Sequence, residues 1–458
     1  MTQLTYAASV RALQERGRFG IRLGLGRTRA ILRELGDPQR AFQGALVAGT
    51  NGKGSVLALA ASALRSAGYR VGETPKPHLV TYRERLQADG RPVDPEAFAR
   101  LVGEVLPVAD RVARRLGGPT EFEILTAIVF RWFAEEAVDV ALVEVGLGGR
   151  LDATHAWDGG VAAITNVDLD HTDRLGPTIA AIAREKAAII ERGDRAVTGA
   201  SGEALAVVRR RARRLDVPLV EAPPARLLGW DRDGIVVEIR GLGETRVGLR
   251  GRHQAANVAV ADALLDALDG AGIAHAGTAD RRHGYATVRW PGRLELLTVE
   301  GPAGPREVLL DGAHNPSGAA VLATALDDLR PFLAGGYGGK AAGRPPLTLV
   351  MATMADKDVG GIVAALAGAE SLDGARIICT ELGLPRSLAA DDLAYRWRST
   401  VPGVRPAIER APAAALDRAL REAPGPIIVA GSLYLVGEIR GRLVDDPDLR
   451  DPEEPRSR

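Results

Sequence analysis

Apolar residues in this chain fall into two alternating patterns. Short runs that are almost entirely apolar are separated by longer segments in which apolar residues recur at spacings of three and four. The first pattern is typical of strands buried in a parallel sheet, and the second of helices that cover its faces. The chain is therefore predicted to be an α/β protein. Strands are predicted over Ala45–Ala48, Asp139–Val145, Val161–Thr165, Ala196–Ala200, Val308–Leu310, Leu347–Met351, Arg376–Thr380 and Ile427–Ala430.

The strand–helix pattern restarts near residue 290, which predicts two domains. The first, over 1–290, has a mostly parallel sheet, and the second, over 291–445, is a smaller Rossmann-like α/β domain. Residues 226–250 alternate around Asp233-Gly234, which is typical of a β-hairpin. The tail, 446–458, is charged and proline-rich and is predicted to be disordered. Helices are predicted over 94–116, 120–134 and 251–268, with a glycine-rich break over 18–27.

A glycine-rich turn joins the first predicted strand to a helix. The turn consists of Gly49, Thr50, Asn51, Gly52, Lys53, Gly54 and Ser55. A strand, such a turn and a helix direct backbone N–H groups and a helix N-terminus at an anion. Lys53 adds a cation for terminal phosphates, and Ser55 offers a hydroxyl to Mg²⁺. The glycine spacing differs from the common P-loop, so we predict a variant P-loop ATPase domain; the alternative is an ordinary strand–helix turn.

Further candidates lie at or just beyond predicted strand ends. Glu144 interrupts an apolar strand near its C-terminal end, and a buried carboxylate there favours a Mg²⁺ site shared with Ser55. The alternatives for Glu144 are a helix cap or an arginine pair. His171, after two aspartates, is by itself typical of a loop histidine held by a carboxylate, and Lys186 of a solvated helix residue.

In the second domain, Asp311 and His314 follow a predicted strand directly. They are candidates to face a nucleotide or substrate, and the alternative is a helix cap.

Composition narrows the class of protein. The chain has 458 residues, a net charge of +1, 46% apolar and 26% charged residues, and the single cysteine Cys379. We expect no nucleic-acid or membrane partner, no internal disulfide, and a cytoplasmic protein. Lysine occurs only at positions 53, 76, 186, 340 and 357, so each lysine is notable in a chain otherwise rich in arginine.

Nine sequence blocks occur together in order and resemble the folylpolyglutamate synthase/dihydrofolate synthase family of the Mur ligase superfamily. They are GTNGKGS (49–55), PHLVTYRERL (77–86), FEILTAIVF (122–130), VEVGLGGRLDAT (143–154), ITNVDLDHTDRLGPTIAAIAREKAAII (164–190), GRHQAANVAVA (251–261), WPGRLE (290–295), LDGAHNPSG (310–318) and AGSLYLVGEIR (430–440). The resemblance implies an ATP-dependent ligase that joins L-glutamate to the carboxylate of dihydropteroate or a reduced folate through an acyl phosphate. It also implies a monomer.

The resemblance assigns roles by position. Glu144 and His171 match Mg²⁺ ligands, and Lys186 matches a lysine that is carbamylated in the family. Lys53, His171 and Lys186 are the expected catalytic residues. ATP is expected to be held by the 49–55 loop together with Asn257, Arg293, Asp311 and His314. The pterin side is expected to be contacted by Arg22, Leu23, Gly24, Thr120, Glu121, Phe122, Glu123, Leu151, Asp152 and Ala153.

Three positions depart from the family pattern. Lys76 stands where a Mg²⁺-binding serine is usual, His155 where asparagine is usual, and Gly26 where glutamate is usual. A protonated lysine cannot bind Mg²⁺, so we expect the Lys76 ammonium to replace part of one metal's charge. Two alternatives remain: a Mur-type ligase acting on a different carboxylate, and a P-loop nucleotide switch without ligase chemistry.

Overall fold

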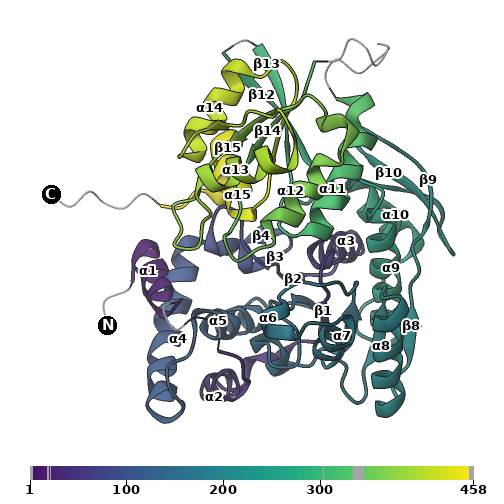
Figure 1. The fold of residues 1–458 in the computed structure, drawn as a ribbon. Coiled ribbons are helices and arrows are strands. Elements are labelled where there is room, and N and C mark those ends of the chain that lie inside the picture. The colour runs from purple at the N-terminus through teal and green to yellow at the C-terminus, as the bar shows by residue number, and fades with distance from the viewer. Residues whose placement is uncertain (1–3, 18–19, 21, 303, 334–344, 453–458) are drawn as a thin grey trace. The chain divides into compact units, whose positions relative to one another are not determined.

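The computed structural model describes residues 4–17, 20, 22–302, 304–333 and 345–452. Contacts between residues divide the chain into two units (Figure 1). The N-terminal unit comprises 1–225, 256–287 and 446–458, and the C-terminal unit comprises 226–255 and 288–445. Both are α/β, which agrees with the class predicted from the apolar pattern.

The N-terminal unit is built on an eight-stranded sheet in the order β4-β3-β2-β5-β1-β6-β7-β8. Neighbours from β2 to β8 are parallel, and β3 and β4 form antiparallel pairs at the edge. Strand β1 therefore lies inside the sheet, with Leu46 paired to Val143 and to Ala162. The strands are β1 (Gly44–Ala48), β2 (Val71–Thr74), β3 (Gln87–Ala88), β4 (Arg91–Pro92), β5 (Val140–Glu144), β6 (Gly160–Ile164), β7 (Arg195–Thr198) and β8 (Leu219–Glu221).

Helices with apolar faces cover this sheet, and Figure 1 shows α7 and α8 side by side. Pro95 at the first position of α4 and the Thr120–Glu123 capping box of α5 explain where these two helices begin. The helices are α1 (Tyr6–Arg16), α2 (Gly26–Glu34), α3 (Lys53–Ser66), α4 (Pro95–Leu116), α5 (Glu121–Glu135), α6 (Thr172–Leu175), α7 (Ile179–Ala187), α8 (Gly202–Leu215), α9 (Gln254–Gly270) and α10 (Thr278–Thr287), with short 3-10 turns at Pro38–Ala41, Tyr82–Arg85, Ala153–Ala156 and Pro447–Leu449.

Helix α10 packs closely on α3, the helix that follows the glycine-rich turn. A Cβ at Gly284 would lie 2.5 Å from Ala63 Cα, so the two backbones approach each other more closely than any larger residue allows. Ser62 Oγ donates a hydrogen bond to the Gly284 carbonyl at 2.8 Å. These contacts bind segment 256–287, with most of α9, to the N-terminal unit.

The C-terminal unit contains a six-stranded sheet in the order β12-β13-β17-β14-β15-β16, in which only the β12–β13 pair is antiparallel. A separate antiparallel sheet has the order β11-β10-β9. Cys379 is buried in β15, as expected for a core residue, and burial raises the pKa of its thiol to about 12. The elements are β9 (Arg226–Asp231), β10 (Gly234–Ile239), β11 (Gly243–Val247), β12 (Glu295–Gly301), β13 (Gly304–Leu310), β14 (Thr348–Met351), β15 (Arg376–Cys379), β16 (Ala407–Ile408), β17 (Ile427–Ala430), α11 (Pro316–Leu329), α12 (Val359–Ala367), α13 (Ala390–Thr400), α14 (Pro412–Glu422) and α15 (Leu433–Leu443), with 3-10 turns at Arg330–Phe332 and Glu370–Leu372.

The contact units differ from the predicted division in two places. The hairpin strands β9 and β10 form where the alternation indicated, but they group with the C-terminal unit. Residues 446–452 are ordered rather than disordered, because Asp451 accepts hydrogen bonds from Thr81 Oγ1 at 2.7 Å and Arg83 Nε at 3.3 Å. Residues 453–458, and positions 18, 19 and 21 of the predicted glycine-rich break, lie outside the described residues. In the part of the chain that is described, no helix is both long and apolar enough to cross a membrane.

Candidate active site

The glycine-rich turn takes a backbone conformation that strongly favours glycine at two positions. Gly49 and Gly52 have φ angles of 155° and 80°. A Cβ at Gly49 would lie 1.8 Å from Thr165 Oγ1, and one at Gly52 would lie 2.3 Å from Asn257 Oδ1. The loop therefore packs against the end of β6 and against α9, which brings the predicted ATP residue Asn257 to the loop.

Residues after β6 hold the loop in place. The Asn51 N–H donates to Asn166 Oδ1 at 2.8 Å, and Thr165 Oγ1 donates to the Asn51 carbonyl at 2.6 Å. The Thr50 N–H donates to the Asn166 carbonyl at 3.0 Å. Helix α3 then begins at Lys53, and its N-cap Gly52 has no side chain to cap the first N–H groups. A preorganised loop and an open helix N-terminus together form an anion-binding geometry.

Two lysines converge on this loop. Lys53 Nζ donates to the carbonyls of Gly49 and Thr50, each at 3.1 Å, and Lys186 Nζ donates to the Gly49 carbonyl at 2.8 Å. The expectation that Lys186 is a solvated helix residue is wrong, because α7 packs inward and leaves the residue only 5% exposed. Burial, and then the nearby charge of Lys53, lowers the pKa of Lys186 to about 7.

Glu144 ends β5 and is surrounded by lysine groups. Its Oε2 accepts the Lys76 backbone N–H at 2.9 Å, its carbonyl accepts the Lys76 ammonium, and its Oε1 lies 3.9 Å from Lys53 Nζ. The partners of Glu144 are thus lysines rather than the arginine considered above. Burial lowers the pKa of Lys76 to about 8, and the carboxylates of Asp152 and Glu144 oppose that shift.

The predicted metal ligands are placed differently from one another. Ser55 and Glu144 are buried, whereas the His171 side chain is 41% exposed, with its Nε2 3.9 Å from Asp170 Oδ1. His171 is the N-cap of α6 with a φ of 50°. Across the described residues, no three His, Cys, Asp or Glu side chains form a group placed to hold a metal. The Mg²⁺ site shared by Ser55 and Glu144 therefore stays a prediction. Such a site would use the serine hydroxyl and phosphate oxygens of the nucleotide in addition to the carboxylate.

Contacts link the three predicted pterin-side segments. The Gly24 N–H donates to the Leu151 carbonyl at 3.3 Å, and Arg22 Nη1 donates to the Gly118 carbonyl at 3.3 Å. Glu123 caps α5 together with Thr120 and is paired with Arg27 Nε at 3.0 Å, and Arg27 Nη2 donates to the Arg22 carbonyl at 3.0 Å.

The remaining residues of these segments have defined surroundings too. Glu121 accepts the Tyr82 hydroxyl at 3.0 Å, and Asp152 accepts the Leu147 N–H at 2.7 Å. Phe122 lies close to Gly146, where a Cβ would be 2.8 Å from its ring. Ala153 is buried, whereas Leu23 is 42% exposed. The substrate assignments of these residues stay predictions.

The three ATP-side residues of the C-terminal unit form a second group. Asp311, directly after β13, accepts N–H groups from Leu294 at 3.0 Å and Ala313 at 2.9 Å. Burial raises the pKa of Asp311, and the positive charge of Arg293 opposes that shift. His314 Nδ1 lies 2.8 Å from the Gly312 carbonyl. The group lies at the C-terminal end of a strand, where ligands bind in open α/β sheets.

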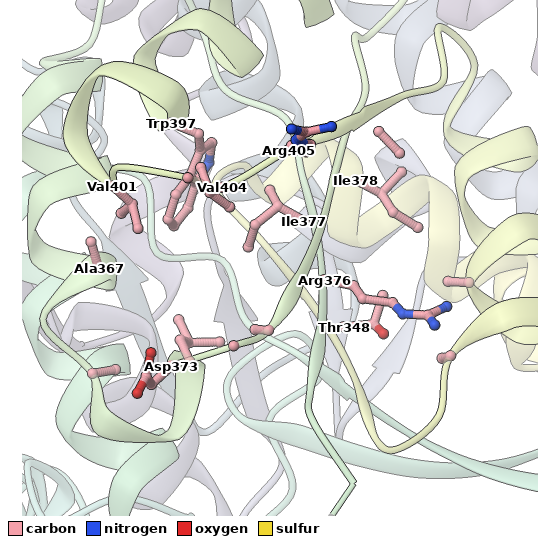
Figure 2. Close-up of a pocket in the computed structure, with 18 of the residues that line it drawn as sticks. Thr348, Ala367, Asp373, Arg376, Ile377, Ile378, Trp397, Val401, Val404 and Arg405 are labelled. Atoms are coloured by element: carbon pink, nitrogen blue, oxygen red, sulfur yellow. The ribbon is translucent and has the colours of Figure 1, made fainter.

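A hollow of about 760 Å³ lies elsewhere in the C-terminal unit (Figure 2). Figure 2 shows Trp397, Val401 and Val404 on one side of it and Thr348 with Arg376 on another. Thr348 and Arg376 begin β14 and β15, so the hollow lies at the opposite ends of the strands from Asp311. It contains no residue predicted for the site.

Comparison with known proteins decides the family. A family model described as the C-terminal domain of dihydrofolate synthetase matches residues 300–443. The dihydrofolate synthase/folylpolyglutamate synthase of Bacillus subtilis is 32% identical over 443 residues, which cover 93% of this chain and 96% of that protein. The chain belongs to the dihydrofolate synthase/folylpolyglutamate synthase family. Membership makes it an ATP-dependent carboxylate–amine ligase.

Solved structures of this family share the fold. Folylpolyglutamate synthase of Mycobacterium tuberculosis, complexed with ADP and AMPPCP, has a TM-score of 0.82 and 31% identity, covering 98% of this chain and 100% of that one. FolC of E. coli, in complex with DHPP and ADP, has a TM-score of 0.79 and 28% identity, covering 96% and 98%. The predicted P-loop domain and Rossmann-like α/β domain agree with these folds.

Two kinds of supporting residue were not predicted from the sequence, those that hold the loop and the arginine that pairs with Glu123. Thr165 and Asn166 support Thr50 and Asn51, and Arg27 neutralises the buried Glu123. A signal existed for Asn166, because it directly follows a predicted strand next to the loop strand. Arg27 is separated from Glu123 by 96 positions, and no local pattern links them.

Proposed function

We propose that residues 49–55 bind the triphosphate of ATP in this member of the family. The observation that carries the proposal is the loop itself. Thr165 and Asn166, after β6, fix its backbone, and the Lys53 ammonium donates a hydrogen bond to the Gly49 carbonyl. No side chain caps the first N–H groups of α3, which leaves the helix N-terminus open to an anion. Phosphoryl transfer requires positioning and charge neutralisation more than covalent help from the protein. As further nucleotide-binding residues we propose Asn257, which packs on Gly52, and, within the C-terminal unit, the grouped Arg293, Asp311 and His314.

Mg²⁺ is proposed as the metal, with Ser55, Glu144 and His171 as its protein ligands. A hydroxyl in the first turn of α3 and a carboxylate at the end of the neighbouring strand β5 are hard oxygen donors that suit this ion. When bound, the ion would neutralise phosphate charge as it develops. The Lys53 ammonium, 3.9 Å from Glu144, supplies further positive charge at the same place.

Lys186 is proposed to be carbamylated. Its amine nitrogen would attack the carbon of CO₂ and lose a proton, leaving a carbamate anion in place of an ammonium. This step needs a neutral amine, and a pKa near 7 leaves a large neutral fraction at physiological pH. A carbamate would carry negative charge beside Lys53, which relieves the repulsion between two buried cations.

The proposed substrates are L-glutamate and dihydropteroate or a reduced folate. A carboxylate oxygen of the pterin substrate attacks the γ-phosphorus of ATP and ADP leaves, which gives an acyl phosphate. The amine of glutamate then attacks the acyl carbon, phosphate leaves, and the nitrogen loses a proton to become the amide. Three connected segments, Arg22–Gly24, Thr120–Glu123 and Leu151–Ala153, are proposed to bind the pterin. A cytoplasmic monomer is proposed as the working form.

Phosphate release tests the proposal directly. Purified protein with ATP and Mg²⁺ is given dihydropteroate or tetrahydrofolate, each with and without L-glutamate. Release that needs both dihydropteroate and glutamate establishes dihydrofolate synthase activity, and release with tetrahydrofolate adds polyglutamylation. If neither pterin supports release, the folate assignment is wrong for this chain, and other carboxylates become the substrates to test.

A further inference from the structure

Lys76 connects the nucleotide side of the candidate site to its pterin side. Its backbone N–H and its ammonium both contact Glu144, next to Lys53. Its ammonium also lies 5.2 Å from the centre of the Phe122 ring. The same ammonium is attracted by the carboxylate of Asp152. Phe122 and Asp152 both belong to segments proposed to bind the pterin, so Lys76 lies at the junction of the two sides, with Arg85 as a second cation lining the same hollow.

The ammonium has donors left for a ligand. A lysine ammonium has three N–H groups. Within the described residues the one hydrogen bond made by Nζ goes to the Glu144 carbonyl. Lys76 also lines a small hollow of about 10 Å³ with Phe122 and Thr154, a volume that admits about one water. A carboxylate oxygen is of similar size to a water and is a stronger acceptor for an ammonium.

A cation at such a junction would assist the proposed reaction. In the proposed site the substrate carboxylate approaches a triphosphate that repels it, near the carboxylates of Glu144 and Asp152. A fixed ammonium between the two sides reduces that repulsion. It can also stay hydrogen-bonded to the attacking carboxylate oxygen while the acyl phosphate forms.

We propose that Lys76 binds the reacting carboxylate of the pterin substrate and positions it for attack on ATP. The inference depends on the proposed function. The alternative is that Lys76 only connects the segment after β2 to β5 through Glu144. In that case the charge of Lys76 would not change the affinity for the ligand's carboxylate.

A double-mutant cycle between ligand and protein distinguishes carboxylate binding by Lys76 from a purely structural role. Dissociation constants of dihydropteroate, and of an analogue with an uncharged amide in place of its carboxylate, are measured without ATP or Mg²⁺ for wild type and Lys76→Met. In wild type the amide analogue should bind roughly 10- to 100-fold more weakly than dihydropteroate, and the substitution should abolish most of that preference. Lys76→Arg, which keeps the charge, should retain it. Arg33→Met, which removes an exposed charge on α2, should leave both constants unchanged.

The outcomes are distinct. An equal preference for the carboxylate in wild type and Lys76→Met overturns the inference, as does a loss that affects acid and amide equally. If Lys76→Met does not fold, Lys76→Gln, which keeps a donor for the Glu144 carbonyl but not the charge, replaces it in the cycle. Trapping of the acyl phosphate by hydroxylamine, measured without glutamate, should fall in Lys76→Met and Lys76→Gln and stay at the wild-type level in Arg33→Met. If wild type itself turns over neither pterin, the proposed function fails; if wild type is active and the cycle shows no coupling, only the role of Lys76 fails.

Discussion

Replacing Gly52 by alanine tests the geometry of the loop most directly. The residue has a φ of 80°, and left-handed backbone costs a residue with a Cβ about 1–2 kcal/mol. The new Cβ would also lie 2.3 Å from Asn257 Oδ1, closer than the 3.0 Å that such contacts respect. Forcing a packed group aside costs about 1–3 kcal/mol. We therefore expect Gly52→Ala to reduce the free energy of unfolding of the N-terminal unit by about 2–5 kcal/mol.

Gly68→Ala is the matched control. Gly68 has a φ of 88°, and a Cβ there meets nothing within 4 Å, so this variant should lose only the backbone share of about 1–2 kcal/mol. Chemical unfolding and the KM for ATP are measured for both. Adding Asn257→Ala should recover about 1–3 kcal/mol in the Gly52→Ala background without restoring the KM for ATP. Equal losses for Gly52→Ala and Gly68→Ala, with no coupling to position 257, would refute the contact between loop and α9.

Three further results are expected. Lys186→Arg should lower glutamate-dependent phosphate release roughly 10- to 100-fold, since an arginine forms no carbamate, and a carbamate signal seen by NMR with isotopically labelled bicarbonate should disappear; a fully active variant contradicts the proposed modification. Burial lowers the pKa of His78 to about 3, so the unfolded chain binds a proton that the native state does not, and stability should fall as pH drops below about 6.5, by about 1.4 kcal/mol per unit. Urea unfolding at about pH 7 and about pH 5 measures this slope. The slope should be shallower in His78→Gln, and an unchanged slope in that variant would show that His78 is not its cause. Glu123→Ala should cost about 3–5 kcal/mol because it leaves Arg27 without its carboxylate. Glu123→Gln also removes that carboxylate but retains the cap, so it should cost less than Glu123→Ala and still destabilise; an unfolding midpoint equal to that of wild type for Glu123→Gln would exclude the ion pair as the reason.

The sequence by itself determined the elements and the chemistry of the loop. Apolar runs place β1, β5 and β6 correctly because a strand covered on both faces has no room for polar residues. Glycine, lysine and serine types in the turn between β1 and α3 carry their chemistry locally, so the phosphate loop could be predicted without any long-range information. Glu144 was recognisable because a carboxylate interrupting such a run requires a partner.

Only the tertiary structure decided which distant groups meet and how they are charged. The solvated helix residue expected at Lys186 is buried on the Gly49 carbonyl, 137 positions away, because α7 packs inward. The tail expected to be disordered is ordered as far as residue 452 because Arg83 and Thr81 bind Asp451. Local composition sets which segments can be helix, strand or coil, whereas burial and pairing arise from contacts between segments far apart in the chain, which no local pattern encodes.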